Sequence, residues 1–293
     1  MNWLQFETDT LCSGRCAICP KGRGMVPHRE PMQWDTVARL VADVVPQAGW
    51  VYPFLYQEPT EEPRLPQILH LIKTVNPKAG TAISTTMTWM TRELQDTLIR
   101  TGDLDVMAIS FYAPDPDTLA QYQPGLDFGD TERRIRRFME ARKAAGADRP
   151  RVTMHYITTT DLTQRRRAFW DRWQGIPDTI GWVHFDDFRG AITGFREDTK
   201  AWTAQNKMRT PCSRLWDGMT VLSSGAVVPC CLDYAGELPL GNVNEEPAMA
   251  IWEGQKIREL RALHEAGRMD EIPLCRNCTV WRQEGTMINM PGK

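Results

Sequence analysis

Short apolar or β-branched runs alternate along this chain with longer segments in which apolar residues recur at helical spacing. The short runs predict strands at Phe6–Thr8, Trp50–Tyr56, Thr81–Thr85, Val106–Tyr112, Val152–Ile157 and Trp182–Phe185. The longer segments predict helices at Met32–Val45, Glu62–Val75, Arg92–Arg100, Thr131–Ala145 and Leu162–Trp173. This alternation predicts a parallel sheet covered by helices. Six units are too few for a closed eight-unit barrel, so we expect an α/β fold with an open, partial (β/α)6 TIM-like barrel.

The pattern changes near residue 200. Gly190–Pro211 is polar and weakly periodic, which predicts a linker, and Pro247–Ala266 predicts a further helix. Between them, Met219–Leu222 and Ala226–Val228 flank Ser223–Gly225, which predicts a β-hairpin with a glycine turn. We therefore expect two domains, a barrel over 1–200 and a small C-terminal domain over 201–293.

Composition and charge limit the partners. Lys+Arg of 35 against Asp+Glu of 37 gives a net charge of −2, whereas a nucleic-acid-binding protein needs a basic excess. No apolar run approaches the roughly 20 residues that a membrane span needs. Met1–Glu7 lacks the basic start and apolar core of a secretory signal, so we expect a cytoplasmic protein with neither a nucleic-acid nor a membrane partner.

The eight cysteines fall into two groups. In a reducing compartment, clustered thiols bind metal or carry out redox chemistry more often than they form disulfides. Three lie near the start and five near the end of the chain: Cys12, Cys16 and Cys19, then Cys212, Cys230, Cys231, Cys275 and Cys278. The two groups predict two inorganic sites.

The first group has the spacing C-x3-C-x2-C, directly after the first predicted strand. Three thiolates in one loop can ligate three irons of a cubane cluster and leave the fourth iron open, while a zinc site with His28 as fourth ligand is the alternative. On a six-unit α/β chain this motif resembles the radical S-adenosylmethionine (radical SAM) superfamily. The resemblance implies that Cys12, Cys16 and Cys19 hold a 4Fe–4S cluster that cleaves SAM to a 5′-deoxyadenosyl radical, which abstracts hydrogen from carbon.

Four further positions extend this resemblance. Gln57-Glu58-Pro59 resembles the Gly-Glu-Pro segment that holds the SAM ammonium, with Gln57 in place of glycine. Thr85 and Ser110 stand at strand ends where the family contacts SAM, and Ile18 stands where an aromatic residue often touches adenine. The alternatives are a surface salt bridge for Glu58 and a strand-end turn for Ser110.

The second group follows the pattern Cys212-x12-Gly225-x4-Cys230, with Cys275-x2-Cys278 later. It resembles the C-terminal SPASM extension of radical SAM enzymes. No cysteine follows Cys278, so the chain is similar to the shortened twitch form, which implies one auxiliary 4Fe–4S cluster held by Cys212, Cys230, Cys275 and Cys278. A structural zinc ribbon is the alternative.

Cys231 is then left over. It is either an inert thiol or alternative ligand, or a hydrogen-atom donor to the far face of a substrate radical. The second reading predicts an epimerase, and the enzymes it most resembles are aminoglycoside epimerases of the neomycin C type. Without a donor, the same architecture favours a dehydrogenase of an amino-cyclitol alcohol, with the auxiliary cluster as electron acceptor.

Two other classes stay open. One is a ribosomal-peptide maturase, although the first strand begins within the first few residues and leaves no room for a leader-binding domain. The other is a non-catalytic electron-transfer protein or zinc-stabilised binding protein.

Carboxylates after the predicted strands suggest the substrate. Asp186 and Asp187 follow the sixth strand and Asp233 follows Cys231, which suits a polyamine or amino sugar, while Tyr112 beside Ser110 is expected to bind a sugar ring. Aspartates after strands are also common helix caps and loop formers, and tyrosines there also pack as core. The radical chemistry further implies an external one-electron donor such as flavodoxin or ferredoxin.

Overall fold

A nine-stranded sheet runs through the computed structural model, which describes residues 1–195 and 209–280. Its first six strands are parallel and lie in the order β6-β5-β4-β3-β2-β1. Their bounds are β1 Trp3–Phe6, β2 Trp50–Tyr52, β3 Gly80–Thr85, β4 Val106–Ser110, β5 Arg151–Thr158 and β6 Thr179–His184. Parallel strands place their carboxyl ends at one edge of the sheet, and the loops at this edge carry the chemistry discussed below.

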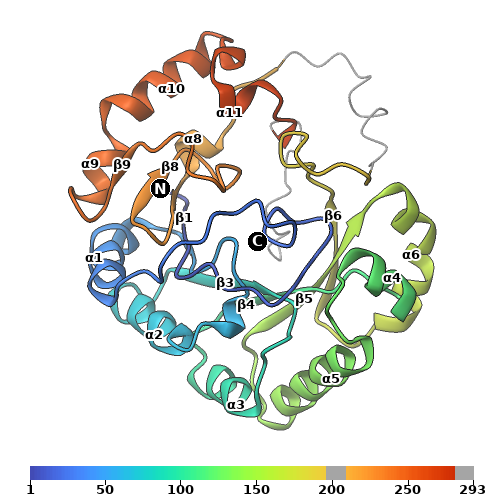
Figure 1. The fold of residues 1–293 in the computed structure, drawn as a ribbon. Helices are drawn as coiled ribbons and strands as arrows, with labels where there is room; N and C mark the ends of the chain where they lie inside the picture. The colour runs from blue at the N-terminus through green and yellow to red at the C-terminus, as the bar shows by residue number, and fades with distance from the viewer. Residues whose placement is uncertain (196–208, 281–293) are drawn as a thin grey trace.

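Helices cover the outer face of the curved sheet, as Figure 1 shows. They are α1 Trp34–Val44, α2 Leu65–Val75, α3 Arg92–Thr101, α4 Pro116–Tyr122, α5 Phe128–Ala144 and α6 Thr160–Trp173, with the 3-10 turns η1 Val45–Gln47 and η2 Pro59–Glu61. The predicted open (β/α)6 barrel is confirmed. No helix within 1–195 or 209–280 is long and apolar enough to cross a membrane.

Several details of the barrel differ from the prediction, among them the first strand, which spans Trp3–Phe6 and not Phe6–Thr8. The second strand ends at Tyr52 and not at Tyr56, because Pro53 has no N–H to continue the ladder. The short helix α4 was not predicted. It begins at Pro116 after an Asp115 cap, whose side chain accepts hydrogen bonds from the backbone N and Oγ1 of Thr118 at 2.8 Å each.

The C-terminal segment extends the same sheet. Strand β7 (Gly218–Val221) pairs in parallel with β1, and β8 (Ala226–Val228) and β9 (Gly241–Asn242) add antiparallel strands beyond it. The predicted hairpin is therefore confirmed, with Gly225 at a φ of +86° that favours glycine. The expected boundary near residue 200 falls among residues 196–208, outside the described residues.

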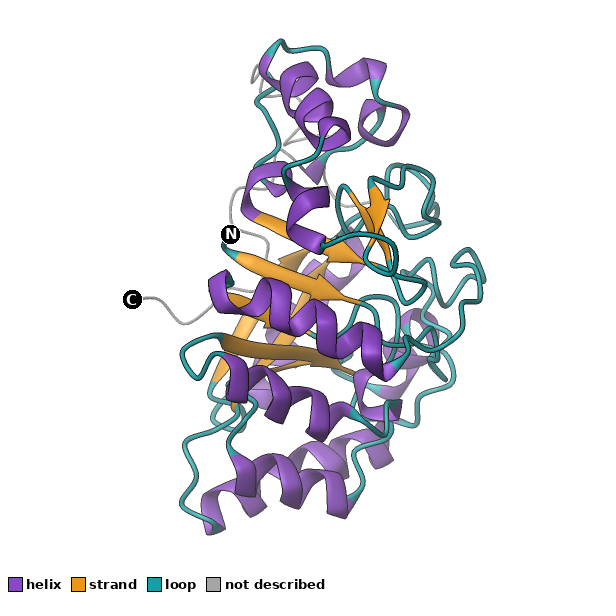
Figure 2. Cartoon of the chain, turned by 90° about the vertical axis from the view of Figure 1, so that its left-hand side faces the viewer, coloured by secondary structure: helices purple, strands orange, loops and turns teal. Residues whose placement is uncertain are grey.

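Short helices complete this end of the molecule, and Figure 2 shows them stacked beyond the sheet. They are α8 Arg214–Asp217, α9 Ala248–Trp252, α10 Gln255–Glu265, the 3-10 turn η3 Met269–Glu271 and α11 Pro273–Arg276. The single helix predicted over Pro247–Ala266 is wrong. It divides at Gly254, whose extended backbone (φ −70°, ψ 171°) forms the N-cap of α10.

The two faces of the sheet have different packing. Leu4 and Phe6 of β1 pack with residues of α1 in one outer core, and residues of β4 and β5 pack with α5 and α6 in another. The inner face carries a separate apolar layer at its base, formed by Trp3, Tyr52, Ala82 and Val106. Residues further along the same inner face are polar, so the inside of the barrel can receive polar ligands.

Candidate active site

The loop of the first cysteine group follows β1 and is held against the end of α4. The backbone N–H of Ala17 donates to the Tyr122 carbonyl at 2.9 Å, and that of Arg15 donates to the Pro124 carbonyl at 3.3 Å. Gln123, between these two anchors, donates from Nε2 to the Ser110 carbonyl at 2.8 Å and lies 3.9 Å from the Cys16 sulfur. The cysteine loop is thereby fixed to the carboxyl end of β4.

The three thiols of this loop are partly buried and close enough to affect one another. Burial, together with the nearby Glu58 and Cys19, raises the pKa of Cys12 to about 12. Burial also raises the pKa of Cys16, with Cys19 and Cys12 adding to the effect. Three thiolates cannot coexist here without a positive partner, so the donor set fits an iron cluster, whose irons replace the thiol protons.

Within the described ranges, no three His, Cys, Asp or Glu side chains converge tightly enough to hold a single metal ion. A cubane cluster does not require such convergence, because each cysteine sulfur binds a different iron. The arrangement is therefore closer to the expected cluster site than to the zinc alternative.

Glu58 lies at the centre of a buried hydrogen-bond network, not in a surface salt bridge. It is 3% exposed, and its Oε1 accepts from Thr60 Oγ1 at 2.7 Å and from Thr85 Oγ1 at 2.5 Å. Its Oε2 accepts from the backbone N and the hydroxyl of Thr86 at 2.8 Å each. The carboxylate joins the ends of β2 and β3 beside the first cysteine group, where a SAM ammonium was predicted to bind.

The neighbouring Gln57 holds the end of β1. Its Oε1 accepts from the backbone N–H groups of Thr8 and Asp9 at 2.8 and 3.1 Å, and its Nε2 donates to Thr8 Oγ1 at 2.5 Å. The side chain is therefore occupied, and only the Gln57 backbone is available for the predicted SAM contact. Ile18 is 5% exposed and packs in the main core, where its contact with adenine stays a prediction.

Ser110 and Tyr112 lie at the end of β4. The Ser110 hydroxyl is 2.8 Å from the Ser84 hydroxyl, and it also hydrogen-bonds the Tyr112 side chain. Burial raises the pKa of Tyr112, and Cys16 and Cys19 contribute to the increase. Tyr112 therefore lies beside the first cysteine group, and its predicted contact with a sugar stays a prediction.

The five cysteines of the second group are brought together around Cys212. It is near enough to Cys230, Cys231, Cys275 and Cys278 to raise the pKa of each thiol, in addition to the effect of burial. The β7–β8 hairpin leads into Cys230 and Cys231, while α11 contains Cys275. Residues from three segments, far apart in sequence, thus form one thiol-rich site.

A partly buried arginine distinguishes this second site. Burial opposes the charge of Arg214, but the thiols of Cys231, Cys230 and Cys212 together with Asp186 raise its pKa. A buried guanidinium needs a negative partner, and a cluster with four thiolate ligands is anionic. The residues here fit an auxiliary iron–sulfur cluster.

His264 supports the same site, because its Nδ1 accepts a hydrogen bond from the Cys212 backbone N–H at 3.2 Å. Sequence reasoning missed Arg214, His264 and Gln123. The only available signal was that Arg214 follows Cys212 by two residues, which is not specific.

Cys231 lies where the two cysteine groups approach each other. Its thiol accepts a hydrogen bond from Nη1 of Arg214. Its carbonyl accepts from the Tyr56 hydroxyl at 2.5 Å. Burial raises the pKa of Tyr56, as do Cys231, Cys19 and Asp186, so this hydroxyl lies near thiols of both groups.

Two of the three predicted substrate carboxylates are placed at this junction. Burial raises the pKa of Asp186, which accepts from the Phe188 backbone N–H at 2.7 Å and lies near Arg214 and Cys231. One Asp187 oxygen is buried and accepts no hydrogen bond from the described residues. Both carboxylates remain suited to a cationic substrate group.

Asp233 does not fit a substrate role. It is fully buried, and its two oxygens accept from the backbone N–H groups of Glu237 and Leu238 at 2.7 and 2.9 Å. The side chain closes its own loop, as aspartates after strands often do, and a substrate would have to displace both bonds. We leave Asp233 out of the candidate site.

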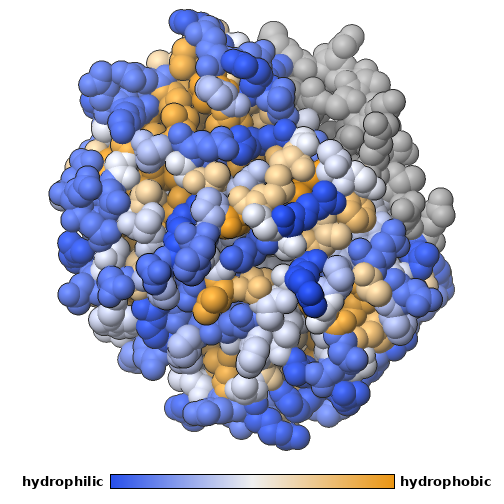
Figure 3. All heavy atoms as spheres, in the orientation of Figure 1, coloured by the Kyte–Doolittle hydropathy of each residue, from blue (hydrophilic) through white to orange (hydrophobic). Residues whose placement is uncertain are grey.

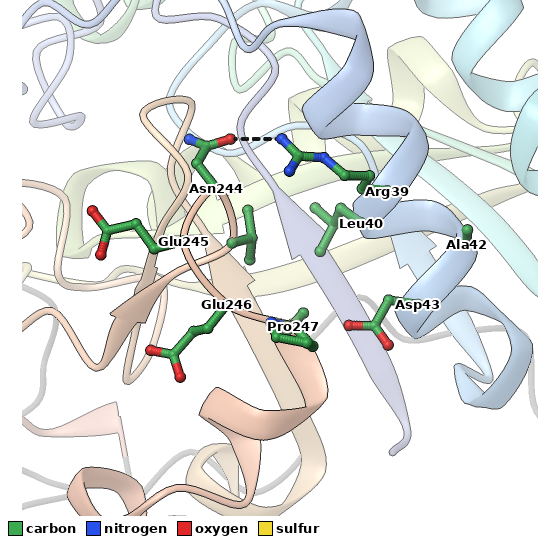
Figure 4. A pocket seen from close by; sticks show the side chains of 10 residues that line it. Arg39, Leu40, Ala42, Asp43, Asn244, Glu245, Glu246 and Pro247 are labelled. Atoms are coloured by element: carbon green, nitrogen blue, oxygen red, sulfur yellow. Dashed lines mark hydrogen bonds between the residues drawn. The ribbon is translucent and has the colours of Figure 1, made fainter.

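One cavity of the outer surface lies away from this chemistry. A cavity of about 540 Å³ between α1 and the β9–α9 loop is lined by no cysteine, and Figure 4 shows Arg39 pointing across it to Asn244. Figure 3 shows that the exposed face is mostly hydrophilic, with small separate apolar patches. The cavity marks where the barrel and the C-terminal segment meet.

Comparisons with known families agree with this site. Residues 8–162 match the family described as the radical SAM superfamily, more than half of the chain. This chain belongs to the radical SAM superfamily. Residues 212–279 match the family described as SPASM, an iron–sulfur cluster-binding domain. The radical SAM enzyme therefore uses SAM and a 4Fe–4S cluster, its SPASM domain implies an auxiliary iron–sulfur cluster, and the zinc and non-catalytic alternatives are not retained.

Relatives of known name are distant in sequence but similar in length. The S-adenosyl-L-methionine-dependent 2-deoxy-scyllo-inosamine dehydrogenase of Niallia circulans is 20% identical over 94% of this chain and 91% of its own length. The structure of BtrN with AdoMet and 2-DOIA has a TM-score of 0.63 at 16% identity and covers 95% of this chain and 93% of that one. That of anSMEcpe with AdoMet has a TM-score of 0.67 at 16% identity, covering 96% and 87%.

Proposed function

We propose that this radical SAM enzyme abstracts hydrogen from a carbon of an amino sugar or amino-cyclitol and inverts that carbon, with Cys231 returning a hydrogen atom. The observation that carries the proposal is the position of Cys231. It is a thiol in excess of the four that an auxiliary cluster needs, and it lies next to Asp186 and to Tyr56, whose hydroxyl is also near Cys19 of the first group.

The first half of the reaction takes place at the loop of Cys12, Cys16 and Cys19. The cluster and SAM, when bound there, supply the 5′-deoxyadenosyl radical. The chain contributes rigidity, because Gln123 fixes the loop to β4 and Glu58 fixes the ends of β2 and β3. We place the SAM ammonium at Glu58 and its ribose or carboxylate at Ser110.

The second half takes place at Cys231. Its S–H bond breaks, a C–H bond forms on the face opposite the one that lost hydrogen, and a thiyl radical remains. One electron and one proton restore the thiol. Cys212, Cys230, Cys275 and Cys278 would hold an auxiliary cluster that would supply this electron, and an external one-electron donor such as flavodoxin or ferredoxin would reduce that cluster again.

The substrate class rests on Asp186 and Asp187. The buried Asp187 oxygen, which accepts no hydrogen bond from the described residues, favours an ammonium group, because an unpaired buried charge is costly. Amino sugars and amino-cyclitols carry both ammonium and hydroxyl groups. Glu62 and Asp115, which also follow strands, are already bound to Arg64 and to the α4 N-terminus, so they do not add to this site.

A dehydrogenase is the second candidate, and the relative from Niallia circulans favours it. In that reaction the substrate radical would lose the hydroxyl proton and one electron, giving a ketone, and an auxiliary cluster held by Cys212, Cys230, Cys275 and Cys278 would accept the electron. Cys231 would then take no part in the chemistry.

Mass spectrometry after reaction in deuterated water separates the two candidates. Anaerobically reconstituted protein is incubated with SAM, a reductant, and a panel that includes neomycin C and 2-deoxy-scyllo-inosamine. A thiol exchanges its hydrogen with solvent, so epimerisation adds one deuteron at carbon, whereas dehydrogenation gives a product lighter by two hydrogens. Deoxyadenosine without any changed panel compound would contradict the substrate class and turn the search to other substrates, ribosomal peptides among them.

The variant Cys231→Ala tests the donor directly. We expect it to keep about eight irons per chain, because two four-iron clusters need only the other seven thiols, and to form deoxyadenosine without inverted product. Loss of auxiliary iron would instead make Cys231 a cluster ligand and contradict its role as donor.

A further inference from the structure

A histidine that the site described above does not use lies inside the barrel. Strand β5 alternates between its two faces, and Val152, Met154 and Tyr156 pack in the outer core with α5 and α6. The intervening residues therefore face inward. The hydrogen bond of 2.8 Å between the hydroxyls of Thr153 and Thr179 agrees with this, and His155 lies on the same inner face two residues further along.

The neighbours of His155 are small and uncharged. In the sheet register it pairs with Ser110 of β4 on one side and Gly181 of β6 on the other. A side-chain Cβ at Gly181 would lie 3.3 Å from Cδ2 of the imidazole and 3.7 Å from its Nε2. Glycine at this position therefore leaves the space that the ring occupies.

His155 is 93% buried, since its exposed fraction is 7%. Its ring makes no hydrogen bond to any of the residues that the structure describes, and burial lowers its pKa to about 4. The ring is thus neutral at physiological pH and has one nitrogen donor and one nitrogen acceptor that no described residue pairs with. A nitrogen donor and a nitrogen acceptor on the inner face of the barrel can therefore pair with a polar ligand that enters it.

The location indicates which ligand. Ser110, the register partner of His155, stands where we place SAM, so His155 lies one strand further from the cysteine loop on the same inner face. A neutral imidazole does not attract an anion, but it matches a hydroxyl group, which can both donate and accept.

Resting on the proposed function, we propose that His155 binds a hydroxyl group of the amino sugar or amino-cyclitol and thereby orients the carbon that loses hydrogen. Asp186 and Asp187 would hold the ammonium groups of the same molecule. His155 is in this view a substrate-positioning residue and neither an acid nor a base.

Two variants test this role. His155→Phe keeps a ring but removes both nitrogens, and His155→Gln keeps a donor and an acceptor. His70→Phe is the matched control, because His70 is exposed on α2. Deoxyadenosine and product are measured with and without neomycin C and 2-deoxy-scyllo-inosamine, over a range of concentrations of whichever probe the wild type converts.

We expect His155→Phe to lower kcat/KM by about tenfold to thirtyfold, the loss of one hydrogen bond or slightly more, mainly through KM. More deoxyadenosine should form per product, substrate-free deoxyadenosine formation should not change, and His155→Gln should recover part of the loss. If the KM and the ratio of deoxyadenosine to product are both unchanged, the proposal is overturned. Loss of substrate-free deoxyadenosine formation would also overturn it and assign His155 to SAM. Failure of the wild type on every probe would instead refute the proposed function, and with it this inference.

Discussion

At the scale of single residues, Tyr56 connects the two halves of the site. Its hydroxyl donates to the Cys231 carbonyl, and its ring packs edge-on against Tyr234 at 5.8 Å. The Tyr56 side chain therefore fixes the backbone of the proposed hydrogen donor from the barrel side.

Replacing Tyr56 with phenylalanine keeps the ring packing and leaves the Cys231 carbonyl without its partner. We expect a loss of about 1–2 kcal/mol in the free energy of unfolding and a lower yield of inverted product. Urea denaturation and product analysis measure the two effects. Tyr52→Phe is the control, since Tyr52 is equally buried and its hydroxyl has no hydrogen bond in the described structure. Equal effects of both variants would contradict the role of Tyr56.

His155 gives a pH dependence of stability. Its pKa is about 4 when folded and near 6.5 when unfolded, so the unfolded chain binds more protons between these values. The contribution of His155 to the free energy of unfolding is fully present above pH 6.5. It is lost as the pH is lowered towards 4, by an amount on the order of 2–3 kcal/mol. Urea midpoints at pH 7 and pH 5 should differ less for His155→Gln than for the wild type or for His70→Gln. An identical difference in all three proteins would contradict the neutral buried state.

At the scale of elements, the β7–β8 hairpin positions Cys230 and Cys231 through its turn. Gly225 has a left-handed backbone, and a Cβ there would lie 2.5 Å from the Asn242 Oδ1 as well as against the Asn244 amide. Asn244 in turn accepts a hydrogen bond of 2.6 Å from Thr36 of α1. The turn thus determines how the hairpin meets both the barrel and the rest of the C-terminal segment.

The variant Gly225→Ala should therefore lower the free energy of unfolding by more than the roughly 1–2 kcal/mol that a left-handed alanine alone costs. Gly146→Ala is the control for this backbone cost, because Gly146 has a φ of +62° and a Cβ at this position would have no atom within 4 Å. The urea midpoint of unfolding and the auxiliary-iron content should both decrease more for Gly225→Ala than for Gly146→Ala. Equal losses in the two variants would show that the contacts with Asn242 and Asn244 do not matter.

At the scale of the whole molecule, one continuous sheet carries two separate inorganic sites. The first cysteine loop is anchored by Tyr122 and Pro124 of the barrel, while the second group is assembled from the hairpin and the last helices. Neither anchor depends directly on the other, although Tyr56 lies between them.

This separation predicts that the two clusters can be lost independently. The double variant Cys275→Ala/Cys278→Ala should fall from about eight to about four irons per chain and still form deoxyadenosine from SAM without substrate. Iron analysis and chromatography of the reaction give both quantities. Loss of deoxyadenosine formation in this variant would show that the first site requires the second.

The sequence by itself determined the repeating strand–helix pattern, the hairpin and the spacing of the cysteines. These features are local, since hydrophobic period, a glycine turn and ligand spacing within one loop are set by neighbouring residues. The end of β2 at Pro53 and the break at Gly254 are also set locally. Each depends on a single residue, and the prediction followed the longer strand or helix pattern around that residue instead.

Only the tertiary structure decided which distant residues share a site. Arg214 and Asp186 approach Cys231 because β7 joins the sheet beside β1. Asp233 was predicted to bind substrate because it follows Cys231 in the sequence, but its side chain accepts two backbone hydrogen bonds that no periodicity predicts. In the sequence, His155 is one residue within a predicted apolar strand and carries no signal of its own. Its inward direction and its place beside Ser110 follow from sheet register, which is set by contacts among strands far apart along the chain.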